Sequence, residues 1–278
     1  KLGEMINLKI DNMKHQHKSI IDGSNEQTSE NAEVKTAEVK AEKKTEKPKK
    51  APKPKAPVEL KDYGFVAVCM GKGITNILKD LGVDRVIEGG QTMNPSTEDF
   101  VSAVEKLNAD HIFILPNNSN IVLAASQAAQ VCSDQDIHVL PSKTIPQGLS
   151  ACVMFNPDVE LEDNLAEMNE AIENVKSGEV TYAIKDTTYD GLEIKKDEYM
   201  GIFGKDICVS CPDCMEATKK LLDKMLDDDS ELVTLIYGDT ATEEQAEEIA
   251  AYIEDNSDAE VEIHEGNQPV YSFIIGVE

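Results

Sequence analysis

Two polar segments, with few charged residues, contain the residue types most suited to binding another molecule. Residues 89–99 read GGQTMNPSTED, and residues 117–120 read NNSN. Carboxamide and hydroxyl groups form hydrogen bonds with a ligand or a partner without adding charge. The candidate binding residues are Gly89, Gly90, Gln91, Thr92, Asn94, Ser96, Asn117, Asn118, Ser119 and Asn120.

Helix capping explains part of this polarity without any ligand. Asn94 or Ser96 can cap a helix that follows, with Pro95 in its first turn. One residue of 117–120 can cap the next helix in the same way. Capping requires few such side chains, and these segments contain more of them than capping needs. We therefore keep a structural role and a contact surface for a ligand or partner as alternatives.

A third polar turn, Gly71-Lys72-Gly73, follows an apolar run and precedes a helical pattern. Backbone amides at a helix N-terminus attract anions, and the lysine adds a positive charge. The complete phosphate-loop pattern GxxxxGK[ST] is absent. This turn is a candidate anion-binding site, and a tight turn that requires glycine is the simpler interpretation.

Three cysteines, Cys208, Cys211 and Cys214, have the spacing of metal ligands. With a fourth donor such as His264, they could hold zinc or an iron–sulfur cluster. We expect the run to open a helix, where a thiolate would be stabilised. Because no second CxxC pair exists, a metal or redox module remains an alternative, and we favour no metal site.

We expect no chemical role for the other cysteines and histidines. Cys69, Cys132 and Cys152 lie among apolar or small residues and are expected to be buried. His111 and His138 lie at or in predicted strands, and we expect them to be packed histidines. His15 and His17 form an HxH pair without a third ligand nearby, so we read them as part of a linker. No Ser-His-Asp order, HExxH motif or nucleophile elbow is present, and we assign no catalytic residue.

Alternating apolar runs position the polar segments of the first half. The strands are expected at 65–70, 85–87, 111–115 and 137–140, and the helices at 74–81, 100–107 and 121–131. Strands that alternate with helices predict a parallel sheet with helices on both faces. The polar segments would then lie beyond the carboxyl ends of the strands, where open α/β sheets bind ligands.

The second half predicts another α/β lobe, with a mixed sheet. The strands are expected at 179–185, 199–203, 232–237, 260–264 and 271–277, and the helices at 160–176, 215–226 and 243–253. Residues 148–155 fit either a helix or a buried crossing. The predicted organisation is a tail of an upstream domain at 1–22, a disordered linker at 23–60, a first lobe at 61–157 and a second lobe at 158–278.

The charge is distributed unevenly along the 278 residues, which carry 27 Lys+Arg against 53 Asp+Glu. The first 60 residues contain 13 lysines and 10 acidic residues, so the remainder carries 14 basic and 43 acidic residues, a net charge of −29. Residues 61–278 are therefore acidic enough to be repelled by nucleic-acid phosphates and by anionic lipid surfaces. Nucleic-acid binding is therefore excluded as the main function.

Cysteine content and hydropathy indicate a cytoplasmic protein with reduced thiols. Six cysteines are too few for a disulfide-rich scaffold of this length. No apolar run approaches the roughly 18 residues of a membrane-spanning helix. The first residue is lysine, so we expect a piece of a longer chain.

Several long motifs resemble the C-terminal half of the kinase component of bacterial fatty acid kinases, a family related to dihydroxyacetone kinases. They are GGQTMNPSTEDF (89–100), ILPNNSNI (114–121), SKTIPQGLSA (142–151) and QPVYSFIIGVE (268–278). IDNMKHQH (10–17) resembles the end of that family's middle domain. The resemblance covers 1–22 and 61–278, and CVSCPDC (208–214) departs from the family pattern.

The resemblance implies a division of labour between domains. It implies that ATP and magnesium bind an N-terminal kinase domain upstream of Lys1, so this region needs no cofactor and is not catalytic alone. It further implies docking of a separate DegV-type fatty-acid-binding protein, whose acyl carboxylate is phosphorylated. The upstream kinase domain is a second expected partner, and a homodimer is left open. The alternative is a crevice that binds phosphate or a glycerone-like molecule.

Overall fold

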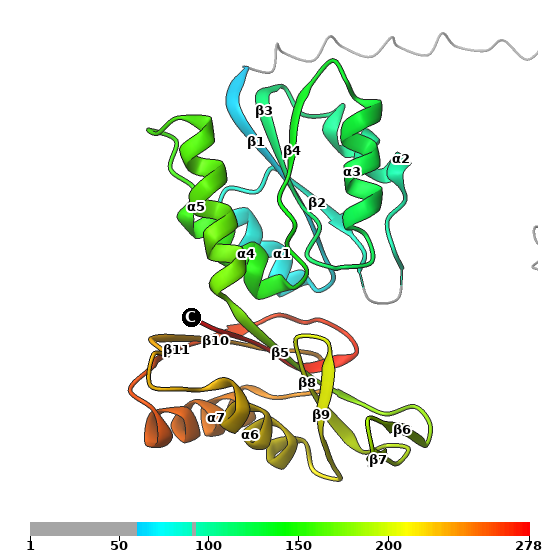
Figure 1. Ribbon diagram of the computed structural model, residues 1–278, viewed down its shortest axis with the longest axis vertical. Coiled ribbons are helices and arrows are strands. Elements are labelled where there is room, and N and C mark those ends of the chain that lie inside the picture. Colours follow the sequence, from blue (N-terminus) through cyan, green and yellow to red (C-terminus); the bar gives the residue numbers. More distant parts are fainter. Residues whose placement is uncertain (1–59, 91–92) are drawn as a thin grey trace, which may run out of the picture. The chain divides into compact units, whose positions relative to one another are not determined.

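The computed structural model describes residues 60–90 and 93–278. The expectations for the tail, the linker, His15 and His17, together with Gln91 and Thr92, fall outside these residues. Among the described residues, the structure confirms the predicted α/β class, with one parallel and one mixed sheet (Figure 1).

The first sheet is fully parallel, with strand order β2-β1-β3-β4. Its strands are β1 (Lys61–Cys69), β2 (Arg85–Glu88), β3 (Ala109–Leu115) and β4 (Asp136–Val139). β1 and β3 are apolar on both faces over most of their length, which is typical of a parallel sheet that is covered on both sides.

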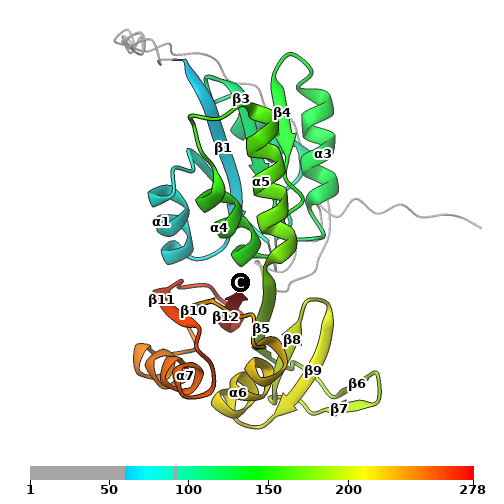
Figure 2. The same ribbon diagram turned by 60° about the vertical axis from the view of Figure 1, so that its left-hand side comes forward.

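Five helices cover the two faces of this sheet. They are α1 (Lys72–Asp80), α2 (Thr97–Val104), α3 (Val122–Val131), α4 (Ile145–Met154) and α5 (Leu161–Asn174). Alternate residues of β1 point to opposite faces, so Val66 and Val68 pack with α2 and α3. Phe65 and Ala67 pack with α1, α4 and α5 on the other face. Figure 2 shows α1 and α3 on opposite sides of this sheet.

The second sheet has the order β11-β10-β12-β5-β8-β9 and is antiparallel except for the pair β10–β11. Its strands are β5 (Lys176–Tyr182), β8 (Tyr199–Phe203), β9 (Asp206–Cys211), β10 (Leu232–Tyr237), β11 (Glu260–Glu265) and β12 (Tyr271–Val277). The hairpin β6 (Thr187–Tyr189) and β7 (Leu192–Ile194) forms a separate ribbon. Helices α6 (Cys214–Met225) and α7 (Glu243–Asn256) cover one face.

The two sheets share part of their apolar core. Phe113 and Leu149 from the first half belong to the same buried cluster as Ile236 and Ile274 from the second. Helix α4 supplies much of this contact, which decides the ambiguity over residues 148–155 in favour of a helix. The hydroxyl of Thr144 caps it by accepting from the backbone N–H of Gln147, and a proline lies in the first turn.

The structure corrects the expectation that all three clustered cysteines open a helix. Cys208 and Cys211 belong to strand β9, and only Cys214 lies at the start of α6. The pairing of β8 with β9 shifts register next to Cys208, and Cys208 packs against the same buried cluster that contains Cys211 and Cys214. Within residues 60–90 and 93–278, no helix has the length and hydropathy that crossing a membrane requires.

Candidate functional site

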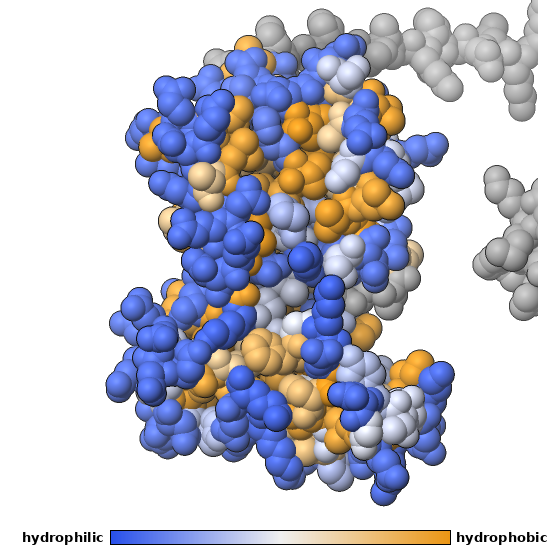
Figure 3. All heavy atoms as spheres, in the orientation of Figure 1, coloured by the Kyte–Doolittle hydropathy of each residue, from blue (hydrophilic) through white to orange (hydrophobic). Residues whose placement is uncertain are grey.

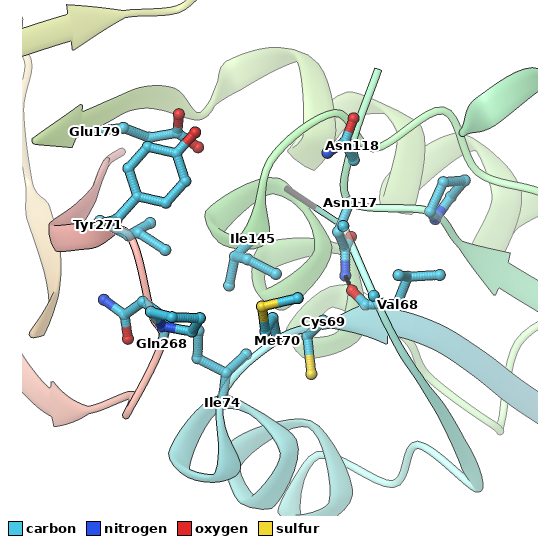
Figure 4. A pocket seen from close by; sticks show the side chains of 15 residues that line it. Val68, Cys69, Met70, Ile74, Asn117, Asn118, Ile145, Glu179, Gln268 and Tyr271 are labelled. Carbon is cyan, nitrogen blue, oxygen red and sulfur yellow. Dashed lines mark hydrogen bonds between the residues drawn. The ribbon is translucent and has the colours of Figure 1, made fainter. Parts of the chain in front are cut away.

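The two polar segments meet at the carboxyl edge of the parallel sheet. Gly89 and Gly90 follow β2, Asn117 and Asn118 follow β3, and all four line the same cavity. Figure 4 shows Asn117 and Asn118 there. Parallel strands end at one edge, so loops separated in sequence come together there. The structure thus brings together the described parts of both predicted segments.

The second half of the chain completes the wall of this cavity. Glu179 of β5, Tyr271 of β12 and Gln268 before β12 face the loops of the first sheet (Figure 4). The cavity has a volume of about 30 Å³. A space of this size holds only one or two water molecules. It therefore has no room for a glycerone-like molecule or an acyl chain.

The hydrogen bonds of Asn117 join separate parts of the fold. Its side-chain amide donates to the carbonyl oxygen of Val68 at 3.0 Å, and its Oδ1 accepts from the hydroxyl of Ser142 at 2.8 Å. The same hydroxyl accepts from the Asn117 backbone N–H at 3.1 Å. The residue is buried and has a positive φ of 54°, a conformation that asparagine tolerates better than most residues. These contacts tie β3 to β1 and to the segment after β4.

The rest of the NNSN segment divides between the interior and the surface. Asn118 is buried, and its Oδ1 accepts from the backbone N–H of Asn120 at 2.9 Å. This bond closes the turn that precedes α3. The expectation that one residue of 117–120 caps the helix is wrong, because Ile121 occupies the N-cap position without a side-chain cap. Ser119 and Asn120 are exposed.

Ser96 has a structural role in the segment after β2. Its hydroxyl accepts from the backbone N–H of Asp99, and the Asp99 carboxylate accepts from the Ser96 backbone N–H at 2.7 Å. This reciprocal capping box starts α2. The Ser96 backbone N–H and hydroxyl both donate to the Asp99 carboxylate, which lowers the pKa of Asp99. Gly89 lies under the loop, where an added Cβ would come within 2.7 Å of the Met93 carbonyl oxygen. Ser96 rather than Asn94 is therefore the cap, and Asn94 is exposed.

Two large apolar side chains stand exposed among these polar residues. Met93 is 64% exposed in the loop before α2, and Leu123 is 69% exposed in the first turn of α3. A hydrogen bond of 3.2 Å between Thr97 and Gln127 holds α2 and α3 side by side. We call the exposed residues of this edge the rim surface; it consists of Met93, Asn94, Ser96, Ser119, Asn120 and Leu123.

The Gly71-Lys72-Gly73 turn uses its amides for contact with the second sheet. The backbone N–H groups of Gly73 and Ile74 both donate to the carbonyl oxygen of Gly266, at 3.0 and 3.2 Å. An added Cβ on Gly73 would lie 1.8 Å from the Glu265 carbonyl oxygen. The glycine is thus explained by close packing, and the predicted anion cradle loses two of its amides. Lys72 is exposed in a neighbouring open groove.

The carboxyl group of Glu179 lies at this cavity, where burial disfavours its ionised form. Burial raises the pKa of Glu179, and the hydrogen bond from the Tyr271 hydroxyl opposes that rise. Burial and the neighbouring carboxylate also raise the pKa of Tyr271. The pair lies on adjacent strands β5 and β12, which are far apart in the sequence.

The clustered cysteines have separate environments. The Cys208 thiol donates to the Gly201 carbonyl oxygen at 3.5 Å, and the Cys211 sulfur accepts from the Lys220 ammonium at 3.3 Å. Burial raises the pKa of Cys208 and of Cys214, which opposes the thiolate that we expected to be stabilised at a helix start. In the part of the chain that the structure describes, these thiols do not belong to a group of converging metal-ligand atoms.

Several residues at this edge escape prediction from the sequence. Glu179, Gln268 and Tyr271 reach the cavity from the second half of the chain, and no local pattern indicates that contact. Met93 and Leu123 lie within or next to the polar motifs, but their exposure depends on the packing of α2 and α3. An apolar residue within a run of uncharged polar residues was the only available signal.

Comparison with solved structures shows the same fold in two classes of protein. A DegV family protein from Corynebacterium glutamicum has 14% identity and a TM-score of 0.59, and the match covers 78% of this chain and 96% of that one. A Thermotoga maritima protein, described as revealing a fatty acid binding function, has 13% identity and a TM-score of 0.59, over 78% and 99% of the two chains. The dihydroxyacetone kinase of C. freundii has 9% identity and a TM-score of 0.55, over 78% and 48%.

Sequence comparison finds closer relatives. Protein YloV of Bacillus subtilis (strain 168) is 47% identical over 277 residues, which is 99% of this chain and 46% of that protein. The uncharacterized protein SAB1090 of Staphylococcus aureus is 40% identical over the same length, again 46% of the relative. The chain thus spans about half the length of these relatives. The model of the FakA-like fatty acid kinase family, C-terminal region, matches residues 64–278, and the chain belongs to this family.

Proposed function

We propose that this chain is the partner-docking region of a fatty acid kinase, and that its rim surface binds a DegV-type fatty-acid-binding protein. The partner would present its acyl carboxylate to an ATP- and magnesium-binding kinase domain that lies outside this chain. Membership of the FakA-like fatty acid kinase family supports a role in such a kinase. The docking step is our own inference, argued from the rim surface.

The lack of charged residues within the two loops of the rim is the observation that carries this proposal, with Glu98 and Asp99 lying just beyond them. Residues 89–97 and 117–123 contain no Asp, Glu, Lys or Arg, although residues 61–278 carry 43 acidic and 14 basic residues. The central parts of protein interfaces are depleted of charge and enriched in residues such as methionine. Met93 and Leu123 supply apolar groups there, and Asn94, Ser119 and Asn120 supply hydrogen-bonding groups around them.

The size of the cavity argues for assigning acyl binding to the partner. Solved DegV proteins share this fold, and the Thermotoga maritima protein is described as revealing a fatty acid binding function. In this chain the cavity at the sheet edge encloses only about 30 Å³. Each added CH₂ group of an acyl chain needs roughly as much space as a water molecule. The same size disfavours phosphate or glycerone binding inside this cavity.

A binding experiment with two matched variants tests the proposal. Leu123 and Val131 lie at opposite ends of α3 and are 69% and 66% exposed. We expect Leu123→Gln to weaken binding of a DegV-type fatty-acid-binding protein from the same genome about tenfold, the effect of losing one apolar contact residue. Val131→Gln should change the Kd less than about twofold. Isothermal titration calorimetry measures both.

Two outcomes would contradict the proposal. One is the lack of any complex between the unmodified chain and the DegV-type protein at high micromolar concentration. The other is an equal loss of affinity for Leu123→Gln and Val131→Gln, which would place the contact away from the rim. Circular dichroism of both variants checks that neither substitution alters the fold.

A further inference from the structure

A cluster of three potential metal ligands lies near the amino-terminal ends of β3 and β4. The Nδ1 atom of His111 is 2.7 Å from Oδ2 of Asp136, and the Nε2 atom of His138 is 3.0 Å from the same oxygen. The three ligand atoms all lie within 4.8 Å of one another. The sequence predicted two separately packed histidines, so this convergence is a product of the fold.

Strand register explains why these side chains meet. In the parallel pair β3–β4, His111 lies opposite Asp136 and Phe113 lies opposite His138. Side chains two residues apart on a strand point to the same face, so Asp136 and His138 share the face of His111. The ligands therefore come from two adjacent strands with fixed backbones, which limits their relative movement.

The imidazole of His138 is held in place but is not satisfied. Its Nε2 atom is buried and has no well-aligned hydrogen-bond partner among the described residues, although Asp136 is near. Aromatic rings support both histidines: Tyr63 lies 5.4 Å from the His111 ring and Phe113 lies 5.9 Å from the His138 ring, measured between centroids. The Asp136 carboxylate is close enough to share an ion with this nitrogen, although the two groups are not aligned as a hydrogen bond.

We propose that His111, Asp136 and His138 bind a divalent transition-metal ion, with zinc as the ion that best fits these ligands. Two imidazoles and one carboxylate are a common zinc ligand set, with bonds of about 2.0–2.2 Å. Tetrahedral ligands at that distance are roughly 3.3 Å apart. The two nitrogen–oxygen distances are about 0.6 and 0.3 Å shorter than this spacing, and the Asp136 side chain is 51% exposed and can move.

The cluster is open to solvent at His111 and Asp136. The side chain of His111 is 34% exposed and that of Asp136 is 51% exposed, so an ion can enter from solvent and retain a water molecule. β4 is the outer strand of its sheet and only four residues long. Hydrophobic residues gather on the surface over the region of β4 and α3 (Figure 3). A metal ion would fasten this short outer strand to β3, and metal binding would stabilise the folded chain.

Equilibrium dialysis of the full, metal-free chain against zinc chloride tests this inference. We expect Asp136→Asn and His138→Gln each to lower the zinc affinity of one site at least about 100-fold, as for loss of a direct ligand. His264→Gln is the matched control, because His264 pairs with a single carboxylate, that of Glu262 at 3.4 Å, and belongs to no three-ligand group of the described residues. His15 and His17 remain in every variant, so metal bound there contributes equally.

Two further measurements keep the result interpretable if a variant folds poorly. Zinc should raise the Tm of the unmodified chain by about 5 °C at 100 times its Kd. It should also shift the NMR signals of the His111 and His138 rings. The proposal is overturned if the Asp136→Asn chain retains full zinc uptake, if His264→Gln loses as much as His138→Gln, or if the two ring signals do not respond.

Discussion

The buried and exposed parts of the carboxyl edge use similar residues for different purposes. Asn117 lies inside, where its amide is fully engaged with Val68 and Ser142. Asn120, three residues later, is exposed, and its backbone N–H takes part in the turn. The comparison shows that an asparagine-rich motif can bury one side chain in a structural role and leave another exposed to solvent. The two positions can therefore be compared by mutation.

The largest effect on stability is expected at the buried asparagine. Asn117→Ala removes the two side-chain hydrogen bonds, which leaves the Val68 carbonyl without this donor and the Ser142 hydroxyl without its acceptor, while the backbone bond to Ser142 remains. Leaving buried polar groups unpaired should lower the free energy of unfolding by about 3 kcal/mol. Asn120→Ala is the control and should change it by less than about 0.5 kcal/mol. Urea unfolding measures both free energies. Equal effects of the two substitutions would contradict a structural role for Asn117 that Asn120 lacks.

A second substitution tests how tightly the buried Asn117 side chain is packed against Gly148 of α4. A Cβ on Gly148 would lie 2.0 Å from Oδ1 of Asn117, so Gly148→Ala forces the two groups apart. Overpacking of this kind costs about 2 kcal/mol. In the Asn117→Ala background the clash disappears, and the cost should fall below about 0.5 kcal/mol. A double-mutant cycle by urea unfolding measures the coupling, and additive effects would contradict it.

Ser96 allows the structural and contact roles to be compared within one side chain. Ser96→Ala removes the capping box of α2 and should cost about 1 kcal/mol of stability. Ser96→Thr keeps the capping hydroxyl and should restore most of this. Thermal unfolding measures both variants. If Ser96→Ala instead weakened partner binding without lowering Tm, Ser96 would be a contact residue first and a cap second.

The mildest test concerns the pH dependence of stability through Glu179. Burial raises its folded-state pKa, so the folded chain binds this proton more tightly than the unfolded chain does. Stability from this residue is therefore greatest at low pH and falls as pH rises above the unfolded value of about 4.3. Glu179→Gln should reduce that fall and make the chain more stable at pH 7. Unfolding curves at pH 4.5 and 7 measure this; an unchanged slope would contradict it.

The sequence was sufficient to predict the α/β class because the apolar patterns that indicate strands and helices are local. Apolar runs such as 111–115 and helical spacing in 160–176 predicted elements that the structure confirms as β3 and α5. The capping role of Ser96 was also one of two predicted alternatives. These features depend on the order of neighbouring side chains, which a sequence displays directly.

Local patterns misled where a residue's role depends on distant neighbours. The cysteine run was expected to open a helix, but the pairing of β9 with β8 extends a strand through Cys211. Residues 117–120 were expected to cap α3, but bonds to Val68 and Ser142 draw the segment inward. In both cases tertiary contacts outweighed a local preference worth about 1 kcal/mol.

The order of apolar and polar residues in this chain determined that it forms alternating strands and helices, and where the uncharged turns fall between them. Only the tertiary structure decided which turn residues are buried, which side chains of the second half close the cavity, and that His111, Asp136 and His138 meet. The physical reason is the range of the interactions. Hydrophobic periodicity acts over a few residues, whereas strand register and sheet packing join residues that are far apart in sequence.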